Sequence, residues 1–152
     1  MDTDDTLLLD NQLCFALYGL SRKMTSLYRP LLKPLGLTYP QYLVMLVMWE
    51  EQVGTSESTL LGVSVQFLGD RLLLDTGTLT PLLKRLEKQG LLTRSRDSSD
   101  ERRLCVRLTD AGLDLRERAQ AVPVSMLCKS PVAPGDLLVL QAELMGLLKK
   151  FK

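Results

Sequence analysis

Three cysteines, Cys14, Cys105 and Cys128, are the residues of this chain best suited to chemistry. The chain contains no histidine, the side chain that most often acts as a general base or metal ligand near neutral pH. Histidine-dependent catalytic triads are therefore excluded, and three well-separated thiols fall short of a four-thiolate zinc site. No glycine is followed by lysine, as a phosphate-binding P-loop requires. We therefore expect no metal and no cofactor, and any chemistry must use a thiol, a tyrosine or carboxylates.

Cys14 lies near the start of an amphipathic helix. Apolar residues recur at steps of three and four from Leu13 to Leu31, a pattern typical of a helix that packs along another helix. With Asp10 as the N-cap, Cys14 would lie in or just after the first turn, where the positive end of the helix dipole favours a thiolate. Tyr18 follows one turn later on the same face. A buried structural thiol is the alternative interpretation.

Tyr28 lies 14 residues beyond Cys14, which is roughly 21 Å along a continuous helix at about 1.5 Å per residue. The two side chains of one subunit therefore cannot touch. If two such helices pack in opposite directions, Tyr28 of one subunit can approach Cys14 of the other. The site would then be a property of a dimer, although ordinary interface packing also explains a tyrosine there.

The other two thiols remain open from the residues alone. Cys105 shares one face of a predicted strand with Arg103 and Arg107, and two positive charges also favour a thiolate. Cys128 follows a helix break expected at Pro123, in a segment that can be mobile. A buried structural role is an alternative for Cys128.

Periodicity and turn signals predict the elements that position these residues. Pro30 and Pro34 close the first helix, a capping box at 38–41 opens the second, and Pro81 requires its helix to start near Thr78 or to bend there. Helices are expected at 13–31, 38–49, 65–73, 79–89, 110–121 and 136–151, and hairpin strands at 91–96 and 102–108. This order predicts a mainly α fold with a small β-hairpin: a winged helix-turn-helix flanked by helices at both ends.

Composition agrees with one ordinary domain. The chain has 152 residues, of which 45% are apolar and 24% charged. The longest clear apolar run, 42–49, is far shorter than the ~20 residues of a membrane helix, so no membrane partner is expected. Aspartates stand near the N-terminus where a signal peptide would carry basic residues, which favours a cytoplasmic, reducing compartment.

The net charge of +1 hides an uneven distribution. From Lys84 to Arg107 there are 8 basic and 4 acidic residues, a local excess of +4. The basic segment coincides with the second helix of the predicted helix-turn-helix and with the hairpin. Such clustering indicates phosphate binding, although a solvated surface of mixed charge is the alternative.

Four segments resemble the MarR (multiple antibiotic resistance regulator) family: Leu9–Tyr18, Leu37–Tyr42, Asp75–Glu87 and Asp100–Arg102. The last two are typical of the family in general. The first two, with their cysteine and tyrosines, resemble its OhrR branch of organic hydroperoxide sensors. The stretch from Gly54 to Gly62 looks longer than the family pattern, and its role stays open.

The resemblance implies a homodimeric repressor that binds double-stranded operator DNA and leaves it when an organic hydroperoxide oxidises Cys14. It implies one MarR-type domain over 1–152, with dimerisation helices at about 1–35 and 110–152 and a DNA-binding lobe at about 36–109. Tyr28 and Tyr39 of the partner subunit would support the thiol, and Cys128 resembles a resolving cysteine that forms an intersubunit disulfide. Cys105 would be incidental, since the wing strand of the family usually has no cysteine.

On the same model the helix from about Thr76 lies in the major groove and Arg102 enters the minor groove. The residues expected to bind DNA are Thr76, Thr78, Thr80, Lys84, Arg85, Arg94, Arg96 and Arg102. Three alternatives remain: a MarR-type repressor released by a small apolar or phenolic ligand, with Cys14 structural; a thiol peroxidase; and a helical protein-interaction module.

Overall fold

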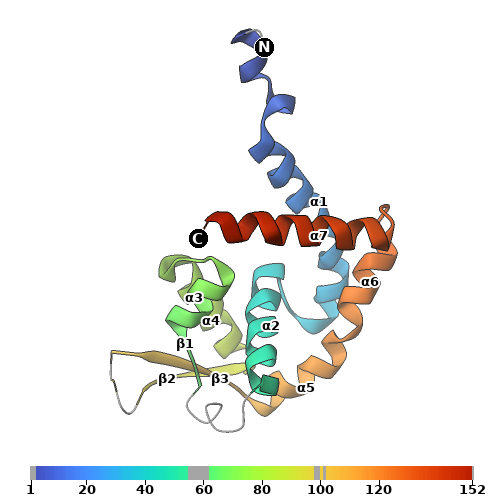
Figure 1. Ribbon diagram of the computed structural model, residues 1–152. Helices are drawn as coiled ribbons and strands as arrows, with labels where there is room; N and C mark the ends of the chain where they lie inside the picture. The colour runs from blue at the N-terminus through green and yellow to red at the C-terminus, as the bar shows by residue number, and fades with distance from the viewer. Residues whose placement is uncertain (1–2, 55–61, 98–99, 101, 152) are drawn as a thin grey trace. The chain divides into compact units, whose positions relative to one another are not determined.

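The computed structural model describes residues 3–54, 62–97, 100 and 102–151. It falls into two compact units, a central unit of Leu32–Gln120 and a terminal unit of Met1–Leu31 with Ala121–Lys152 (Figure 1). The expected DNA-binding lobe, at about 36–109, lies inside the central unit, whose bounds differ from it by at most eleven residues. The roles of the two units stay predictions. Most of the stretch between Gly54 and Gly62, and part of the hairpin tip, lie outside the described residues.

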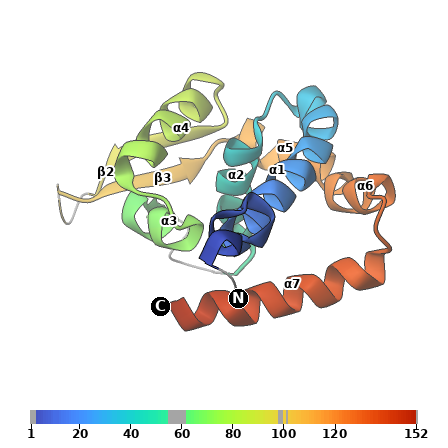
Figure 2. The same cartoon turned by 90° about the horizontal axis from the view of Figure 1, so that it is seen from above.

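The central unit is the predicted winged helix-turn-helix. Its elements are η3 (Lys33–Leu35), α2 (Tyr39–Gly54), β1 (Val63–Ser64), α3 (Val65–Leu72), α4 (Thr76–Lys88), β2 (Leu92–Arg96), β3 (Leu104–Leu108) and α5 (Asp110–Ala119). Most of these elements are helices, and β2 and β3 run antiparallel and side by side (Figure 2). The predicted mainly α fold with a small β-hairpin is therefore confirmed.

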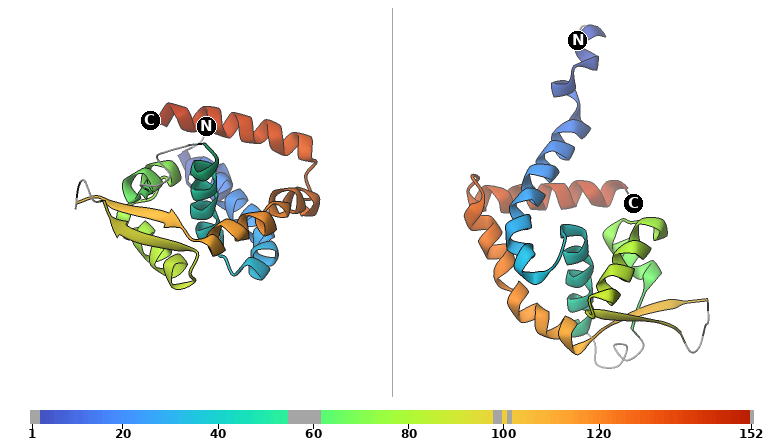
Figure 3. Two further views of the ribbon diagram at one scale, coloured as in Figure 1. Left: turned by 90° about the horizontal axis from the view of Figure 1, so that it is seen from below. Right: turned by 180° about the vertical axis from the view of Figure 1, so that it is seen from behind.

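The hairpin belongs to a three-stranded sheet in the order β1-β3-β2. Figure 3 shows its two longer strands, β2 and β3, side by side. Val63 pairs with Val106 and Ser64 with Cys105, so β1 completes the second edge of β3. β1 was not predicted, because two residues are too few to display the alternation that identifies a strand. Its addition makes β3 the central strand.

Apolar residues of the helices and strands build the core of the central unit. α2 is largely buried, as predicted, and α4 contributes a buried stripe at Leu79, Leu83 and Leu86. The indole Nε1 of Trp49 donates a hydrogen bond to the Gly112 carbonyl at 2.8 Å. This bond ties α2 to α5 and satisfies a polar group that burial would otherwise leave unpaired.

Side-chain caps set the helix starts. The Thr38 amide and hydroxyl both donate to Gln41 Oε1, at 2.9 and 3.0 Å, which confirms the predicted capping interaction. Asp75 caps α4, so this helix begins at Thr76 and Pro81 lies inside it. Of the two alternatives drawn from Pro81, a start near Thr78 is therefore two residues late, because the Asp75 cap sets the helix start at Thr76, the position that the family resemblance implied.

The terminal unit contains η1 (Thr3–Leu7), η2 (Leu9–Asn11), α1 (Leu13–Leu32), α6 (Ala121–Lys129), α7 (Pro134–Leu148) and η5 (Lys149–Phe151). Asp10 lies within η2 and is not the N-cap of α1, which corrects the sequence expectation. The Gln12 carbonyl accepts the first backbone bonds of α1, from Phe15 and Ala16.

Two prolines also behave differently from the prediction. Pro30 lies inside the last turn of α1, which continues to Leu32. Pro123 lies in the first turn of α6, after a break at Gln120. The first turn tolerates proline because an amide in this turn has no partner within the helix.

Over the described ranges, no single helix has the length and hydropathy of a membrane span, although the bent pair 110–129 and 134–151 passes that test jointly by length and composition.

Candidate DNA interface and thiol site

The second helix of the helix-turn-helix, α4, presents polar and basic side chains opposite its buried stripe. Thr76, Thr78, Lys84 and Arg85 are exposed, and Thr80 is half-buried. The Asp75 carboxylate accepts the Thr78 amide at 2.9 Å and the Thr78 hydroxyl at 2.8 Å. These bonds, the hydroxyl first, hold the pKa of Asp75 below its usual range. The cap is therefore charged near neutral pH.

An ion pair joins α4 to the wing. Glu87 Oε2 accepts hydrogen bonds from Arg94 Nε at 2.9 Å and Nη2 at 2.6 Å, and Glu87 Oε1 accepts the Arg94 amide at 3.1 Å. Arg94 is half-buried. Its guanidinium pairs with Glu87 within the central unit, and its predicted contact with DNA stays a prediction. The structure gives Arg94 the task of holding β2 against α4.

This ion pair predicts an acid-sensitive contribution to stability. The Arg94 side-chain hydrogen bond is the largest cause that lowers the pKa of Glu87 from its ordinary 4.5. A group whose folded pKa is lowered stabilises the fold fully above its unfolded pKa and loses that contribution as pH falls through the folded value. We expect Glu87→Gln to lower the urea midpoint at pH 7, and the difference from wild type to shrink as the pH falls below the ordinary 4.5 and to vanish below the lowered pKa of the folded protein.

A double-variant cycle tests the same contact. Arg94→Gln should give a similar loss at pH 7, and the double variant should be little worse than either single one, because each removes the same pair. Strictly additive losses, or a Glu87→Gln difference that persists at low pH, would contradict this account.

The rest of the wing carries the other predicted basic residues. Arg96, at the end of β2, and Arg102, in the turn before β3, are both exposed. The Arg102 amide donates to Asp100 Oδ1 at 3.0 Å, which shapes the turn and leaves its side chain on the surface. The positions of these arginines are compatible with phosphate or minor-groove contacts, which stay predictions.

The far end of α4 is tied to the start of α2 by two glutamines that the sequence analysis did not select. Gln89 Nε2 donates to the Gly36 carbonyl at 2.7 Å, and Gln41 Nε2 donates to Gln89 Oε1 at 3.3 Å. Gln41 is buried. No sequence signal identifies such a pair, because 48 residues separate its members.

The three thiols have different environments. Cys14, the second residue of α1, and Cys128, in α6, are both exposed, whereas Cys105 is buried. Cys105 is buried although Arg103 and Arg107, predicted to share its strand face, are exposed. At the middle of β3 both successive residues, Cys105 and Val106, are buried, because a central strand can be covered on both faces.

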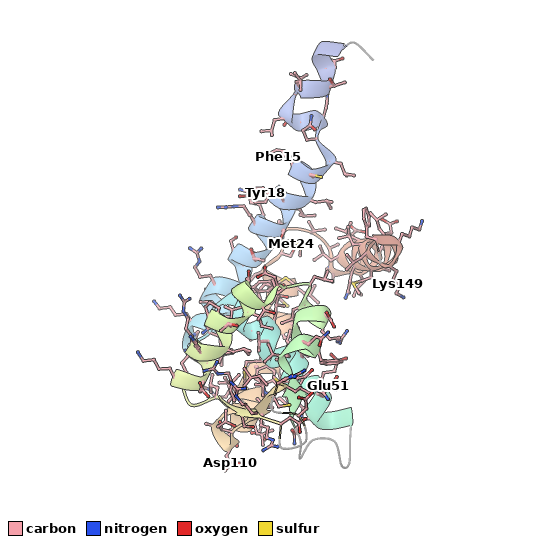
Figure 4. The ribbon with its side chains drawn as sticks, turned by 90° about the vertical axis from the view of Figure 1, so that its left-hand side faces the viewer. Phe15, Tyr18, Met24, Glu51, Asp110 and Lys149 are labelled. Atoms are coloured by element: carbon pink, nitrogen blue, oxygen red, sulfur yellow. The ribbon has the colours of Figure 1, made fainter. Side chains whose placement is uncertain are left out.

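Three tyrosines also differ in how far they are buried. Tyr39, the first residue of α2, is half-buried, and burial raises its pKa. Tyr28 is half-buried on α1. Tyr18 is exposed beside Phe15 on α1 (Figure 4). Arg22 Nη1 donates to the Tyr18 hydroxyl at 3.0 Å, with its guanidinium 5.5 Å from the ring centroid. Cys14, Tyr18 and Tyr28 thus share one helix, and Tyr39 belongs to the other unit.

The terminal segments leave a large apolar surface uncovered. Of the 20 large hydrophobic side chains exposed among the described residues, only Leu46, Phe67 and Leu73 lie in the central unit. The other 17 lie on η1, η2, α1, α6, α7, η5 and the adjoining turns. Apolar exposure concentrated in this way marks an interaction surface.

A capped recognition helix, an exposed set of basic side chains and a three-stranded wing define a winged-helix DNA-binding regulator. Sequence comparison identifies the family. The model of the SarA/Rot transcriptional regulators matches residues 26–118. The chain belongs to the MarR/SarA-type transcriptional regulators and binds DNA in that capacity, which confirms the resemblance drawn from its four segments.

The relatives include redox-associated regulators. The organic hydroperoxide resistance transcriptional regulator of Bacillus subtilis (strain 168) is 45% identical over 145 residues, covering 95% of this chain and 92% of the relative. AbfR of Staphylococcus epidermidis is 36% identical. Its reduced, DNA-bound structure has a TM-score of 0.73 over 99% of both chains.

Two further AbfR structures represent oxidised states. The overoxidised protein bound to DNA has a TM-score of 0.72 over 99% of this chain and 100% of AbfR, at 36% identity. The disulfide form has a TM-score of 0.61 over 95% of this chain and 96% of AbfR, also at 36% identity. All these relatives are regulators, which supports a non-enzymatic role and disfavours a thiol peroxidase.

Proposed function

We propose that this protein is a homodimeric repressor that senses organic hydroperoxides through Cys14 and releases its operator when that thiol is oxidised. The observation that carries the proposal is the position of Cys14. It is an exposed thiol in the first turn of α1, in a chain 45% identical to an organic hydroperoxide resistance regulator.

The redox step balances without a cofactor. The Cys14 thiolate attacks the terminal peroxide oxygen, an S–O bond forms as the O–O bond breaks, and the sulfur becomes a sulfenic acid. The alkoxide that leaves takes a proton from water and becomes the alcohol. The Cys128 thiol of the partner subunit then attacks that sulfur, so that an S–S bond forms and water leaves. Tyr28 and Tyr39 of the partner would donate hydrogen bonds to the reacting thiol, as the resemblance implies.

The dimer is supported by the exposed apolar side chains of the terminal unit. The 17 exposed hydrophobic residues there include Leu13, Leu17 and Leu20 on α1 and Leu144, Leu147 and Leu148 on α7. A second copy of the chain would remove this surface from water at about 25 cal/mol per Å². The same arrangement would bring Cys14 of one subunit within reach of the partner's residues.

For the DNA contacts, we place α4 in the major groove and Arg102 of the wing in the adjacent minor groove. Thr76, Thr78 and Thr80 would face base edges, and Lys84, Arg85 and Arg96 would bind phosphates or guanine. A symmetric dimer would read half-sites about one helical turn, ~34 Å, apart. Its affinity should fall steeply with salt.

An operator titration tests the redox proposal. Wild type, Cys14→Ser and Cys105→Ser are titrated onto DNA from the region upstream of the gene, with and without cumene hydroperoxide. We expect the hydroperoxide to release wild type and Cys105→Ser from the DNA, because the thiol that Cys105→Ser removes is buried. Cys14→Ser should stay bound. Equal release of Cys14→Ser would contradict the proposal and favour a non-covalent ligand mechanism. Loss of the response in Cys105→Ser alone would move the sensor to the wing.

A further inference from the structure

The hydroxyl of Thr78 has a defined hydrogen-bonding polarity. A threonine hydroxyl has one proton and two acceptor lone pairs, whereas an ionised carboxylate can only accept. Thr78 Oγ1 lies 2.8 Å from Asp75 Oδ2. Asp75 is charged near neutral pH, so the hydroxyl must be the donor in this bond. In any further hydrogen bond, the Thr78 hydroxyl oxygen can therefore only be the acceptor.

The position of Thr78 makes this polarity relevant to DNA. Thr78 is the third residue of α4 and its side chain is exposed. In helix-turn-helix proteins, the N-terminal residues of the recognition helix contact base edges. A threonine without such a partner can donate to a base or accept from it, and so discriminates weakly. The Asp75 carboxylate removes that freedom.

We propose that Thr78 is a specificity-determining residue that accepts a hydrogen bond from an exocyclic amino group in the major groove, N6 of adenine or N4 of cytosine. The same oxygen opposes O4 of thymine and O6 of guanine, since two acceptors repel each other. The proposal rests on the placement of α4 in the major groove under the proposed function, and it is independent of the thiol chemistry. Asp75 acts as the positioning residue.

The test uses the reduced full-length protein, so that thiol oxidation plays no part. Wild type, Thr78→Val and Thr78→Ser are each used to select tight-binding duplexes from a pool randomised around the upstream operator. We expect one position per half-site at which wild type prefers adenine or cytosine on the contacted strand by about five- to twentyfold. Thr78→Val should lose this preference, because valine has the same shape without the oxygen, and Thr78→Ser should keep it.

Base analogues and a polarity variant complete the test. Replacing the preferred adenine by purine, which lacks the amino group, should weaken wild type by a similar factor and leave Thr78→Val unaffected. Asp75→Asn keeps a good N-cap, but its amide can donate to Thr78. This variant should accept thymine or guanine at the same position. Ratios between bases are compared, because removing the charge also changes the overall affinity.

The possible failures are distinguishable. Sequence-specific binding by wild type without any Thr78-dependent position overturns this inference alone, as does a Thr78-dependent position that prefers thymine or guanine. Failure of reduced wild type to bind any duplex at low salt contradicts the DNA-binding arrangement itself. Circular dichroism and thermal unfolding establish that each variant is folded.

Discussion

Hydroperoxide-treated Cys128→Ser protein should stay on its operator under conditions that release the wild type. We expect the wild-type affinity to fall by on the order of tenfold to a hundredfold, the range of typical coupling energies. The variant should change by less than about threefold. The reason is that a sulfenic acid alters one side chain, whereas an intersubunit disulfide constrains two chain segments and can force a rearrangement. AbfR is solved bound to DNA both when reduced and when overoxidised, and separately with its disulfide formed.

The measurement combines operator titration with mass spectrometry of the treated protein. Treated Cys128→Ser should carry oxidised Cys14 and still bind DNA, while treated wild type should carry a disulfide between Cys14 and Cys128. Cys105→Ser serves as the matched cysteine control and should behave as wild type. Release of oxidised Cys128→Ser in the absence of other thiols would show that sulfenic acid formation suffices.

Gly112→Ala should destabilise the central unit by about 3 kcal/mol or more, through overpacking that a backbone neighbour cannot relieve. A Cβ at Gly112 would clash with the Leu91 carbonyl oxygen and lie 3.1 Å from Leu108 Cδ2. The Leu91 carbonyl accepts the Thr109 amide at 3.1 Å. The clash therefore pushes α5 away from the end of the hairpin and strains the Trp49 bond to Gly112.

Urea unfolding checks this prediction, followed through the fluorescence of Trp49, the single tryptophan of the chain. In an unconstrained helix, replacing glycine by alanine would stabilise the fold by about 1 kcal/mol. A loss of stability in Gly112→Ala would therefore come from the steric clash. Ala111→Gly, at an exposed position on the same helix, is the matched control. It should cost no more than about 1 kcal/mol. Unchanged stability of Gly112→Ala would mean that α5 and the hairpin approach each other less closely.

Elements with local signals were predicted well. The starts of α2 and α5 follow from local caps that the structure contains: Gln41 accepts the Thr38 amide, and the Thr109 hydroxyl accepts the Gly112 amide. The strands β2 and β3 follow from alternation along the chain. The winged helix-turn-helix could therefore be recognised before any contact between distant segments was known. Errors occurred where two local signals competed, as for Asp10 and Pro81.

Properties that depend on distant segments were not predictable in the same way. The burial of Cys105 requires a strand at 63–64 and a covered sheet, and alternation along β3 alone contains neither. The occupation of Arg94 by Glu87 requires β2 to lie against α4. Basic residues look alike in a sequence whether they face solvent or an internal carboxylate.

Residue types and short-range spacing were enough to predict the element order, the caps and the set of residues able to do chemistry. The motifs of the sequence also determined the family. Three properties became known from the folded chain alone: Cys14 and Cys128 are exposed while Cys105 is buried, Arg94 pairs with Glu87, and a side chain at position 112 would clash with Leu91. The physical reason is that burial, pairing and close approach depend on the chain segments that fold against a residue, which can be dozens of positions away.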